Sequence, residues 1–191
     1  MKPRPTREQL LAAKGKTIRD VIAPRLKVLF VGINPGLYSA AVRHHFARPG
    51  NRFWPVLHAA GFTERLLSPS EERELLKWGY GITNVVAQAT ATAAELSTEQ
   101  FVTGGQRLSA KVQRYRPRAV AVLGLGAYRV AFARPRALAG RQEQMLAGAS
   151  LWVLPNPSGL NANYQMKQLV RLFRRLRHAV DDRSAHRPRR R

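Results

Sequence analysis

The chain has 191 residues, enough for one domain with a sizeable hydrophobic core, and contains 33 lysine and arginine residues against 11 aspartate and glutamate residues. The resulting formal net charge of +22 indicates a polyanionic partner, of which nucleic acid is the commonest. The chain has no cysteine, which excludes disulfide bonds, cysteine-ligated zinc, iron–sulfur clusters and thiol nucleophiles.

Hydrophobic periodicity and helix-capping signals predict helices and strands that alternate along the chain. The first half is expected to contain a helix near residues 6–14, a strand from residue 26 to about 33, an irregular loop over 34–49, helices over 51–60 and 68–78, and a strand over 80–86. The second half is expected to contain helices over 97–115, 127–132 and 164–180, and strands over 118–124, 142–147 and 150–154. This alternation predicts a three-layer α/β/α domain with a mainly parallel central sheet.

Charge and composition divide the chain into three regions. We expect a basic N-terminal extension over residues 1–25, the folded domain over 26–180, and a basic, disordered tail over 181–191. The sequence shows neither a secretory signal pattern nor an apolar run of ~18 residues. We therefore expect a monomer in the cytoplasm, without a membrane association.

Two predicted core strands run into turns of the same chemistry. The first leads into Asn34-Pro35-Gly36, and the last leads into Asn156-Pro157-Ser158-Gly159. Proline fixes φ and glycine permits unusual backbone angles, so each turn can hold an asparagine side chain rigidly. Because sites in open α/β sheets lie at the carboxyl ends of strands, we expect both asparagines to face one planar polar ligand.

Acidic residues are scarce where this site is expected. The aspartates of the chain are Asp20, Asp181 and Asp182, and neither asparagine turn contains a carboxylate. Paired-carboxylate glycosidase chemistry and two-metal nuclease chemistry are therefore excluded. Glu72 is interpreted as an ordinary residue of a helix start, whereas Glu95 has no such structural explanation.

Two other features could suggest a metal or a nucleotide cofactor. His44 and His45 are adjacent, and on an extended segment their side chains would point to opposite faces, so we expect no metal site there. Gly124-Leu125-Gly126 follows a predicted strand, but Arg129 occupies the position of the third glycine of a dinucleotide fingerprint. We therefore expect neither a metal nor a cofactor.

Three segments together resemble the family of mismatch-specific uracil-DNA glycosylases and thymine-DNA glycosylases. They are Gly32-Ile33-Asn34-Pro35-Gly36, Pro49-Gly50-Asn51-Arg52-Phe53-Trp54 and Asn156-Pro157-Ser158-Gly159-Leu160, within a resemblance that runs from about residue 26 to residue 180. The resemblance implies the uracil-DNA glycosylase fold and a monofunctional enzyme of base excision repair. Such an enzyme hydrolyses the N-glycosidic bond of uracil, and of thymine or damaged pyrimidines, in mismatched DNA without a cofactor.

The resemblance also implies roles for individual residues. Asn34 would hold the attacking water, and Asn156 would order its own loop and contact the base. The base would stack on Phe46 and meet polar groups of the Ile33 backbone and Ser158. Ser39 would line the pocket near C5 of the base.

The remaining implications concern the DNA strand and two departures from the family. The loop Ser158–Asn161 would enter the duplex, with Gly159, Leu160 and Asn161 as the wedge and Leu160 filling the vacated stack. Relatives are more polar around Ala93, so a water-activating acid is missing if one belongs there, and Glu95 is the candidate substitute. After the wedge, the chain also lacks the cation with which some relatives read the opposing base.

The sequence leaves three matters open. A basic module that recognises flipped or mispaired bases without cutting the bond is the alternative function. The preferred base can be uracil, thymine or ethenocytosine, and the DNA partner can be a uracil-containing or mispaired duplex or a single strand.

Overall fold

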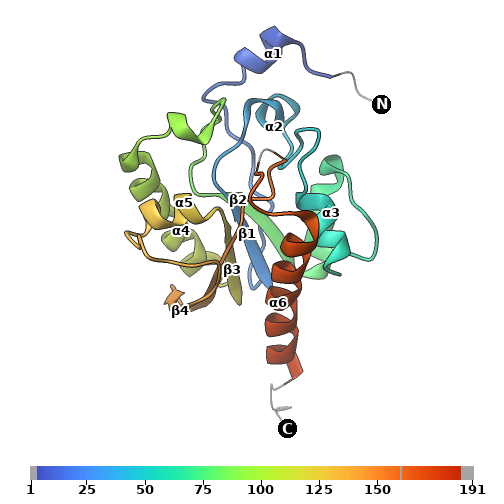
Figure 1. Cartoon of the computed structure of the whole chain (residues 1–191), viewed down its shortest axis with the longest axis vertical. Coiled ribbons are helices and arrows are strands. Elements are labelled where there is room, and N and C mark those ends of the chain that lie inside the picture. The colour runs from blue at the N-terminus through green and yellow to red at the C-terminus, as the bar shows by residue number, and fades with distance from the viewer. Residues whose placement is uncertain (1–3, 160, 186–191) are drawn as a thin grey trace.

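A five-stranded sheet forms the centre of the protein in the computed structural model, which describes residues 4–159 and 161–185 (Figure 1). The strands are β1 (Val28–Gly32), β2 (Tyr80–Asn84), β3 (Ala119–Leu123), β4 (Gly140–Leu146) and β5 (Ala149–Leu154). Their order is β2-β1-β3-β5-β4, and only the edge strand β4 is antiparallel to its neighbour. The mainly parallel sheet predicted from the sequence is confirmed.

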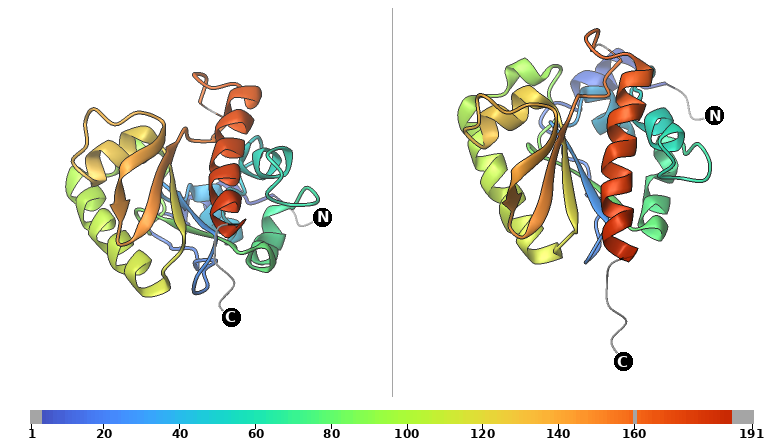
Figure 2. Two further views of the ribbon diagram at one scale, coloured as in Figure 1. Left: turned by 90° about the horizontal axis from the view of Figure 1, so that it is seen from below. Right: turned by 60° about the horizontal axis from the view of Figure 1, so that its bottom comes forward.

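Helices cover both faces of the sheet. They are α1 (Arg7–Leu11), α2 (Leu37–Val42), α3 (Phe53–Ala59), η1 (Pro69–Trp78), η2 (Ala93–Glu95), α4 (Thr98–Tyr115), α5 (Leu125–Ala131) and α6 (Met166–Ala185). Figure 2 shows α3 and α6 on one side of the sheet, and α4 and α5 on the other. The three-layer α/β/α architecture is thereby confirmed.

Alternating residues of the central strands supply two separate hydrophobic cores. In β1, Phe30 packs with Phe53 and Phe173 on the α3 and α6 side, whereas Leu29 and Val31 belong to the core under α4 and α5. All residues of β1 and β3 are buried, as expected for parallel strands covered on both faces. Hydrophobic burial on both faces therefore fixes these strands in the middle of the domain.

The predicted loop over 34–49 contains a short helix. Helix α2 begins after Gly36 and ends at Arg43, whose φ of 61° breaks the helical path. One and a half turns carry too few apolar positions for a periodic signal, which explains why the helix was missed. The segment predicted as a helix over 68–78 is helical, but it adopts the tighter 3₁₀ geometry.

The two ends of the domain also differ from the expected boundaries. Helix α6 continues to Ala185, five residues beyond the expected end, so the predicted disordered tail is wrong for residues 181–185. Residues 186–191 lie outside the described part of the chain. Within the N-terminal segment, Val21 is buried and pairs with Ile82 beside β2, so part of this segment packs on the sheet. Among the described residues, no helix is both long and apolar enough to span a membrane.

Parallel pairing brings the two asparagine turns to one edge of the sheet. Strand β3 lies between β1 and β5, with Val31 opposite Val122 and Leu123 opposite Leu154. Because these strands run in the same direction, the segments after β1 and β5 leave the sheet at the same edge. Both asparagine turns therefore begin at the same edge of the sheet, with the end of one strand, β3, between them.

Candidate functional site

A cavity of about 230 Å³ lies where these strand ends meet. Its lining includes residues from both asparagine turns and from the segment between β2 and α4, among them Ile33, Asn34, Ser39, Phe46, Ala93, Asn156 and Ser158. Gly159 lines a neighbouring hollow with Pro49 and Gly50. Leu160, the predicted wedge, lies outside the described residues. The structure thus gathers the predicted base-pocket residues in one place, while their chemical roles stay predictions.

The Asn34 side chain is held by its amide nitrogen. Nδ2 donates to Thr90 Oγ1 at 2.7 Å, to the Gln88 carbonyl at 3.1 Å and to the Pro35 carbonyl at 3.2 Å. The hydrogen bonds of the described residues leave Oδ1 as the acceptor that this amide can offer to a water or a ligand. The plane of the amide is therefore set before any ligand binds.

The same contacts place the segment around Ala93 against the Asn34 turn. Thr90 donates its backbone N–H to Pro35 and its hydroxyl to the Thr92 carbonyl, at 3.2 and 2.7 Å. Ala93 follows directly and lines the cavity. A longer side chain at position 93 would consequently start from the cavity wall.

Glu95 does not substitute for an acid at this wall. Its carboxylate accepts the Thr92 N–H at 2.9 Å and pairs with Lys14 Nζ at 2.9 Å. The hydrogen bond from Lys14, followed by the one from Thr92, lowers the pKa of Glu95. Glu95 is absent from the residues that line the cavity, so the interpretation of Glu95 as a substitute acid is wrong.

The Asn156 side chain stabilises its own turn. Oδ1 accepts the Ser158 N–H at 3.0 Å, and the Asn156 carbonyl accepts Nδ2 of Asn161 at 2.9 Å. Oδ1 is thereby engaged inside the loop, which leaves the amide N–H groups of Asn156 as the donors for a ligand. Asn34 and Asn156 thus offer opposite hydrogen-bonding groups to the cavity.

Asn84 and Phe46 approach the end of β1 from two sides. A Cβ atom at Gly32 would lie 2.4 Å from Asn84 Oδ1 and 3.2 Å from Phe46 Cζ, so any larger residue would have to displace the Asn84 side chain. The Phe46 ring stacks on Phe53 with centroids 4.0 Å apart. Asn84 ends β2 and lines the cavity, although the sequence analysis assigned it no role. Its position as a third asparagine at a strand end is the signal that could have revealed it.

Comparison with known families agrees with this geometry. Residues 19–177 match the family described as the uracil DNA glycosylase superfamily. The chain belongs to the uracil DNA glycosylase superfamily. Membership supports DNA glycosylase activity, that of a hydrolase that acts on DNA.

A solved structure of similar fold is the solution structure of a candidate uracil DNA glycosylase from Methanosarcina acetivorans. The two chains share 20% sequence identity over 86% of this chain and 99% of the other, with a TM-score of 0.58. At this identity the likeness establishes the fold alone. This shared fold agrees with the sheet described above, which helices cover on both faces.

Arg52 is a residue near the cavity that the sequence analysis quoted without a role. Its guanidinium donates to the carbonyls of Ser158 at 2.6 Å, Tyr164 at 2.6 Å and Asn161 at 2.9 Å. Its backbone N–H donates to Pro157 at 3.0 Å. Arg52 therefore ties the start of α3 to the loop after β5, more than a hundred residues away. No local pattern could have predicted these contacts.

His44 and His45 both bind one buried carboxylate. Glu72 accepts from His45 Nδ1 at 2.9 Å, from the His45 N–H at 2.8 Å and from His44 Nδ1 at 3.2 Å. Burial alone would raise the pKa of Glu72, but the hydrogen bonds from His45 and His44 outweigh it and lower that pKa. The two rings converge because the segment is not extended, with φ of 61° at Arg43 and 53° at Phe46.

This cluster corrects one expectation, because the histidine side chains do not point to opposite faces. Glu72 lies in the first turn of η1, as expected, but it is only 7% exposed and binds both histidines. Within the described part of the chain, no group of three or more histidine, aspartate or glutamate residues is arranged to hold a metal ion.

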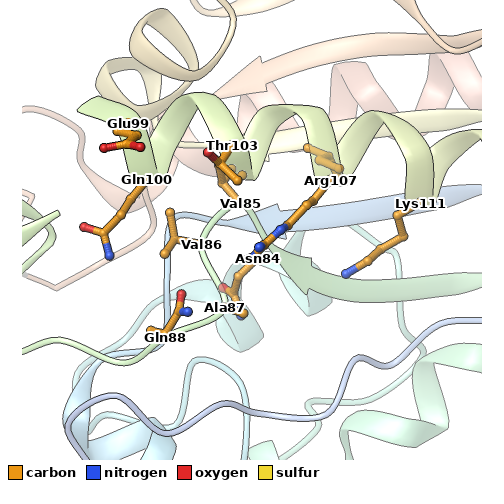
Figure 3. Close-up of a pocket in the computed structure, with 12 residues that line it drawn as sticks. Asn84, Val85, Val86, Ala87, Gln88, Glu99, Gln100, Thr103, Arg107 and Lys111 are labelled. Atoms are coloured by element: carbon orange, nitrogen blue, oxygen red, sulfur yellow. The ribbon is translucent and has the colours of Figure 1, made fainter. Parts of the chain in front are cut away.

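A second cavity, of about 260 Å³, lies on the other side of the segment after β2. Figure 3 shows Arg107 and Lys111 of α4 extending towards Asn84. Lys111 Nζ is bound to Asp20 and to Thr83, at 2.5 and 2.7 Å. None of the residues predicted from the sequence lines this cavity, so the one between the asparagine turns is the candidate site.

Proposed function

We propose that this member of the superfamily is a mismatch-specific glycosylase that hydrolyses the N-glycosidic bond of uracil, and of thymine or damaged pyrimidines, in DNA. It would act as a monofunctional enzyme and begin base excision repair. The observation that carries the proposal is that Asn34 and Asn156, from turns 122 positions apart in sequence (156 − 34 = 122), line one cavity. The high net positive charge supports a DNA partner.

The target base must leave the duplex, because its glycosidic bond is inaccessible inside the stack. Phe46 supplies an aromatic surface that is itself supported by Phe53. Stacking of a base on such a ring contributes about 1–3 kcal/mol and tolerates several bases. The Asn156 N–H groups and the Ile33 backbone are suited to contact the polar edge of a pyrimidine.

Asn34 would position the attacking water. Its Nδ2 donates to three oxygen atoms of the protein, which leaves Oδ1 to accept a hydrogen bond from that water. An amide is not a useful general base, so Asn34 would orient the water without taking its proton. The rate must therefore come from placement of the water and from stabilisation of the departing base anion. This chemistry predicts slow turnover and a preference for good leaving groups.

The lining of the cavity agrees with a hydrolytic mechanism. It contains Arg48 but no lysine among the described residues, so no amine stands there to form a Schiff base with the sugar. It also contains no aspartate or glutamate. A base-recognition module that leaves the bond intact is favoured by this second observation and remains the alternative function.

The loop after Asn156 would enter the duplex. Gly159 packs closely on Gly50, where an added Cβ would lie 2.5 Å from the Gly50 carbonyl oxygen. This contact and the Arg52 hydrogen bonds hold the loop against the start of α3. A loop supported in this way can insert an apolar side chain at the cost of unstacking one base step.

Abasic-site formation separates the two functions. We would incubate the protein with duplexes that carry uracil opposite guanine or opposite adenine, and a single strand that carries uracil, and then cleave with alkali. Strand breaks at uracil, lost in Asn34→Ala with binding retained, support the glycosylase. Binding without breaks in both the natural chain and Ala93→Asp would favour the recognition module instead.

A further inference from the structure

One buried nitrogen in the site has no hydrogen-bonding partner. Among the described residues, His45 Nε2 is the buried side-chain polar atom for which the structure provides none. The residue is 2% exposed. Buried polar atoms are almost always hydrogen-bonded, so an exception at a cavity wall indicates a group that a ligand completes.

The rest of His45 is firmly held. Glu72 accepts from both the ring Nδ1 and the backbone N–H, and the His45 carbonyl accepts Nε1–H of Trp54 at 3.3 Å. A carboxylate can only accept, so Nδ1 carries a proton whether the ring is neutral or charged. Nε2 is therefore an acceptor on the neutral ring and a donor on the imidazolium.

His45 also lies in the right place to meet a base. It lines the cavity directly before Phe46, and Ser39 on the same wall accepts the Ala47 N–H at 3.1 Å. Glu72, which accepts from Nδ1, is not a lining residue of the cavity. Because Nδ1, the backbone N–H and the carbonyl of His45 are all engaged, Nε2 is the polar atom that this lining residue has left for a ligand.

We propose that His45 reads a polar group on the edge of the flipped base through Nε2, and that the protonation state of the ring selects between keto and amino groups. The inference rests on the proposed function, because it requires a base in this cavity. The neutral ring accepts from an exocyclic amino group, as in cytosine derivatives. The imidazolium donates to an exocyclic oxygen, as in uracil.

Three ionisable groups surround this ring. Glu72 of η1 contacts it directly, His44 of the same loop shares that carboxylate, and Arg48 lines the cavity two residues beyond Phe46. The pH dependence of base selection is therefore a property of these three side chains as well as of His45.

A binding experiment isolates the readout from catalysis. The probes are duplexes with a 2′-fluoroarabino nucleotide, which resists hydrolysis, carrying uracil or cytosine opposite an abasic-site analogue so that no pairing partner competes. The dissociation constants are measured from pH 5.5 to 8.5, and their ratio cancels general effects of pH on DNA binding. For the natural chain, we expect the preference for uracil over cytosine to grow about tenfold as the pH falls.

Two variants provide the comparison. In His45→Asn, the amide can still donate to Glu72 but nothing reaches the position of Nε2, whereas His45→Gln places a group there that does not titrate. Both should show a ratio that is constant with pH to within about twofold. A constant ratio in the natural chain, or an equal pH dependence in either variant, would overturn the inference.

The inference and the proposed function fail separately. Alkali-labile sites at uracil with a ratio that does not vary with pH would leave the glycosylase intact and remove the role of His45. A pH-dependent ratio without any abasic product would keep the role of His45 and favour the recognition module.

Discussion

Arg52 Nη2 donates a hydrogen bond to the Ser158 carbonyl at 2.6 Å and joins the start of α3 to the loop that follows β5. The same guanidinium reaches the carbonyls of Asn161 and Tyr164. A planar guanidinium presents five donors in a fixed fork and reaches carbonyls on several sides, whereas the three donors of a lysine ammonium all lie on one nitrogen. The orientation of the loop after β5 therefore depends on a residue outside that loop.

The substitution Arg52→Lys should loosen the loop after β5. We expect the free energy of unfolding to fall by about 1–3 kcal/mol because hydrogen bonds from a charged donor are lost. Excision of uracil from duplex DNA should fall by about 10–100-fold, since misplaced groups reduce the rate strongly. Excision of uracil from a single strand should fall less, because no stack has to be opened.

Arg174→Lys is the matched control for this substitution. Arg174 also donates its guanidinium to a backbone carbonyl, that of Ala59 at 2.9 Å, but it lies on α6 and does not line the cavity. Its replacement should leave excision unchanged. An equal loss of activity in both variants would show that Arg52 acts through general stability alone.

Asn34→Ala removes both the acceptor for the water and the contacts of Nδ2 to Thr90 and Gln88. We expect the single-turnover excision rate to fall by about 10²–10³-fold, while the dissociation constant for uracil-containing DNA changes little. Asn163→Ala is the control, because Asn163 is exposed, does not line the cavity and donates its backbone N–H to Asn161, a bond that the substitution keeps. A retained rate in Asn34→Ala would remove this asparagine from the mechanism.

Gly32→Ala tests the close approach of Asn84. The new methyl group would lie 2.4 Å from Asn84 Oδ1, so the asparagine must move out of its position in the cavity. We expect a loss of about 1–3 kcal/mol in the free energy of unfolding, measured by urea denaturation, and a weaker uracil preference.

Two further variants sharpen this test. In Gly32→Ala with Asn84→Ala, the offending oxygen is absent, so most of the lost stability should return. Gly126→Ala lies in α5 with no atom within 4 Å of the added group, and it should be neutral or raise stability by about 0.5–1 kcal/mol. Equal destabilisation by Gly32→Ala with and without Asn84 would contradict the proposed clash.

The lowered pKa of Glu72 makes stability depend on pH. A carboxyl group whose pKa is lower in the folded state contributes stability above its unfolded pKa, about 4.3, and loses it as the pH falls through the folded value. We expect Glu72→Gln to be less stable than the natural chain at neutral pH. The difference should shrink in acid.

Glu74→Gln is the control, because Glu74 pairs only with exposed Lys77 on the same helix. Surface pairs of this kind contribute about 0–1 kcal/mol. Thermal unfolding of the three proteins at pH 7 and at pH 3 provides the comparison. A difference between Glu72→Gln and the natural chain that persists at pH 3 would indicate lost packing rather than lost charge pairing.

Much of the fold could be predicted because its signals are local. The apolar runs of β1 and β3 are buried throughout, and the capping boxes at Ser68 and Ser97 are present as expected. Helix α2 was missed because it is short, and the end of α6 was misplaced because charge was taken to indicate disorder. Short helices and helix ends depend on tertiary contacts more than on composition.

The candidate site, like the fold, has features that the sequence could predict and features that depend on tertiary contacts. The sequence by itself determined which candidate residues to consider, since Asn34 and Asn156 stand in turns with fixed backbone preferences and Phe46 matches an aromatic residue of the family that the chain resembles. Only the tertiary structure decided that Asn84 and His45 line the same cavity, and that Glu72 and Arg52 hold lining residues in place. Those contacts join segments that are distant in the chain, and their geometry arises only when parallel strands bring their carboxyl ends to one edge of the sheet.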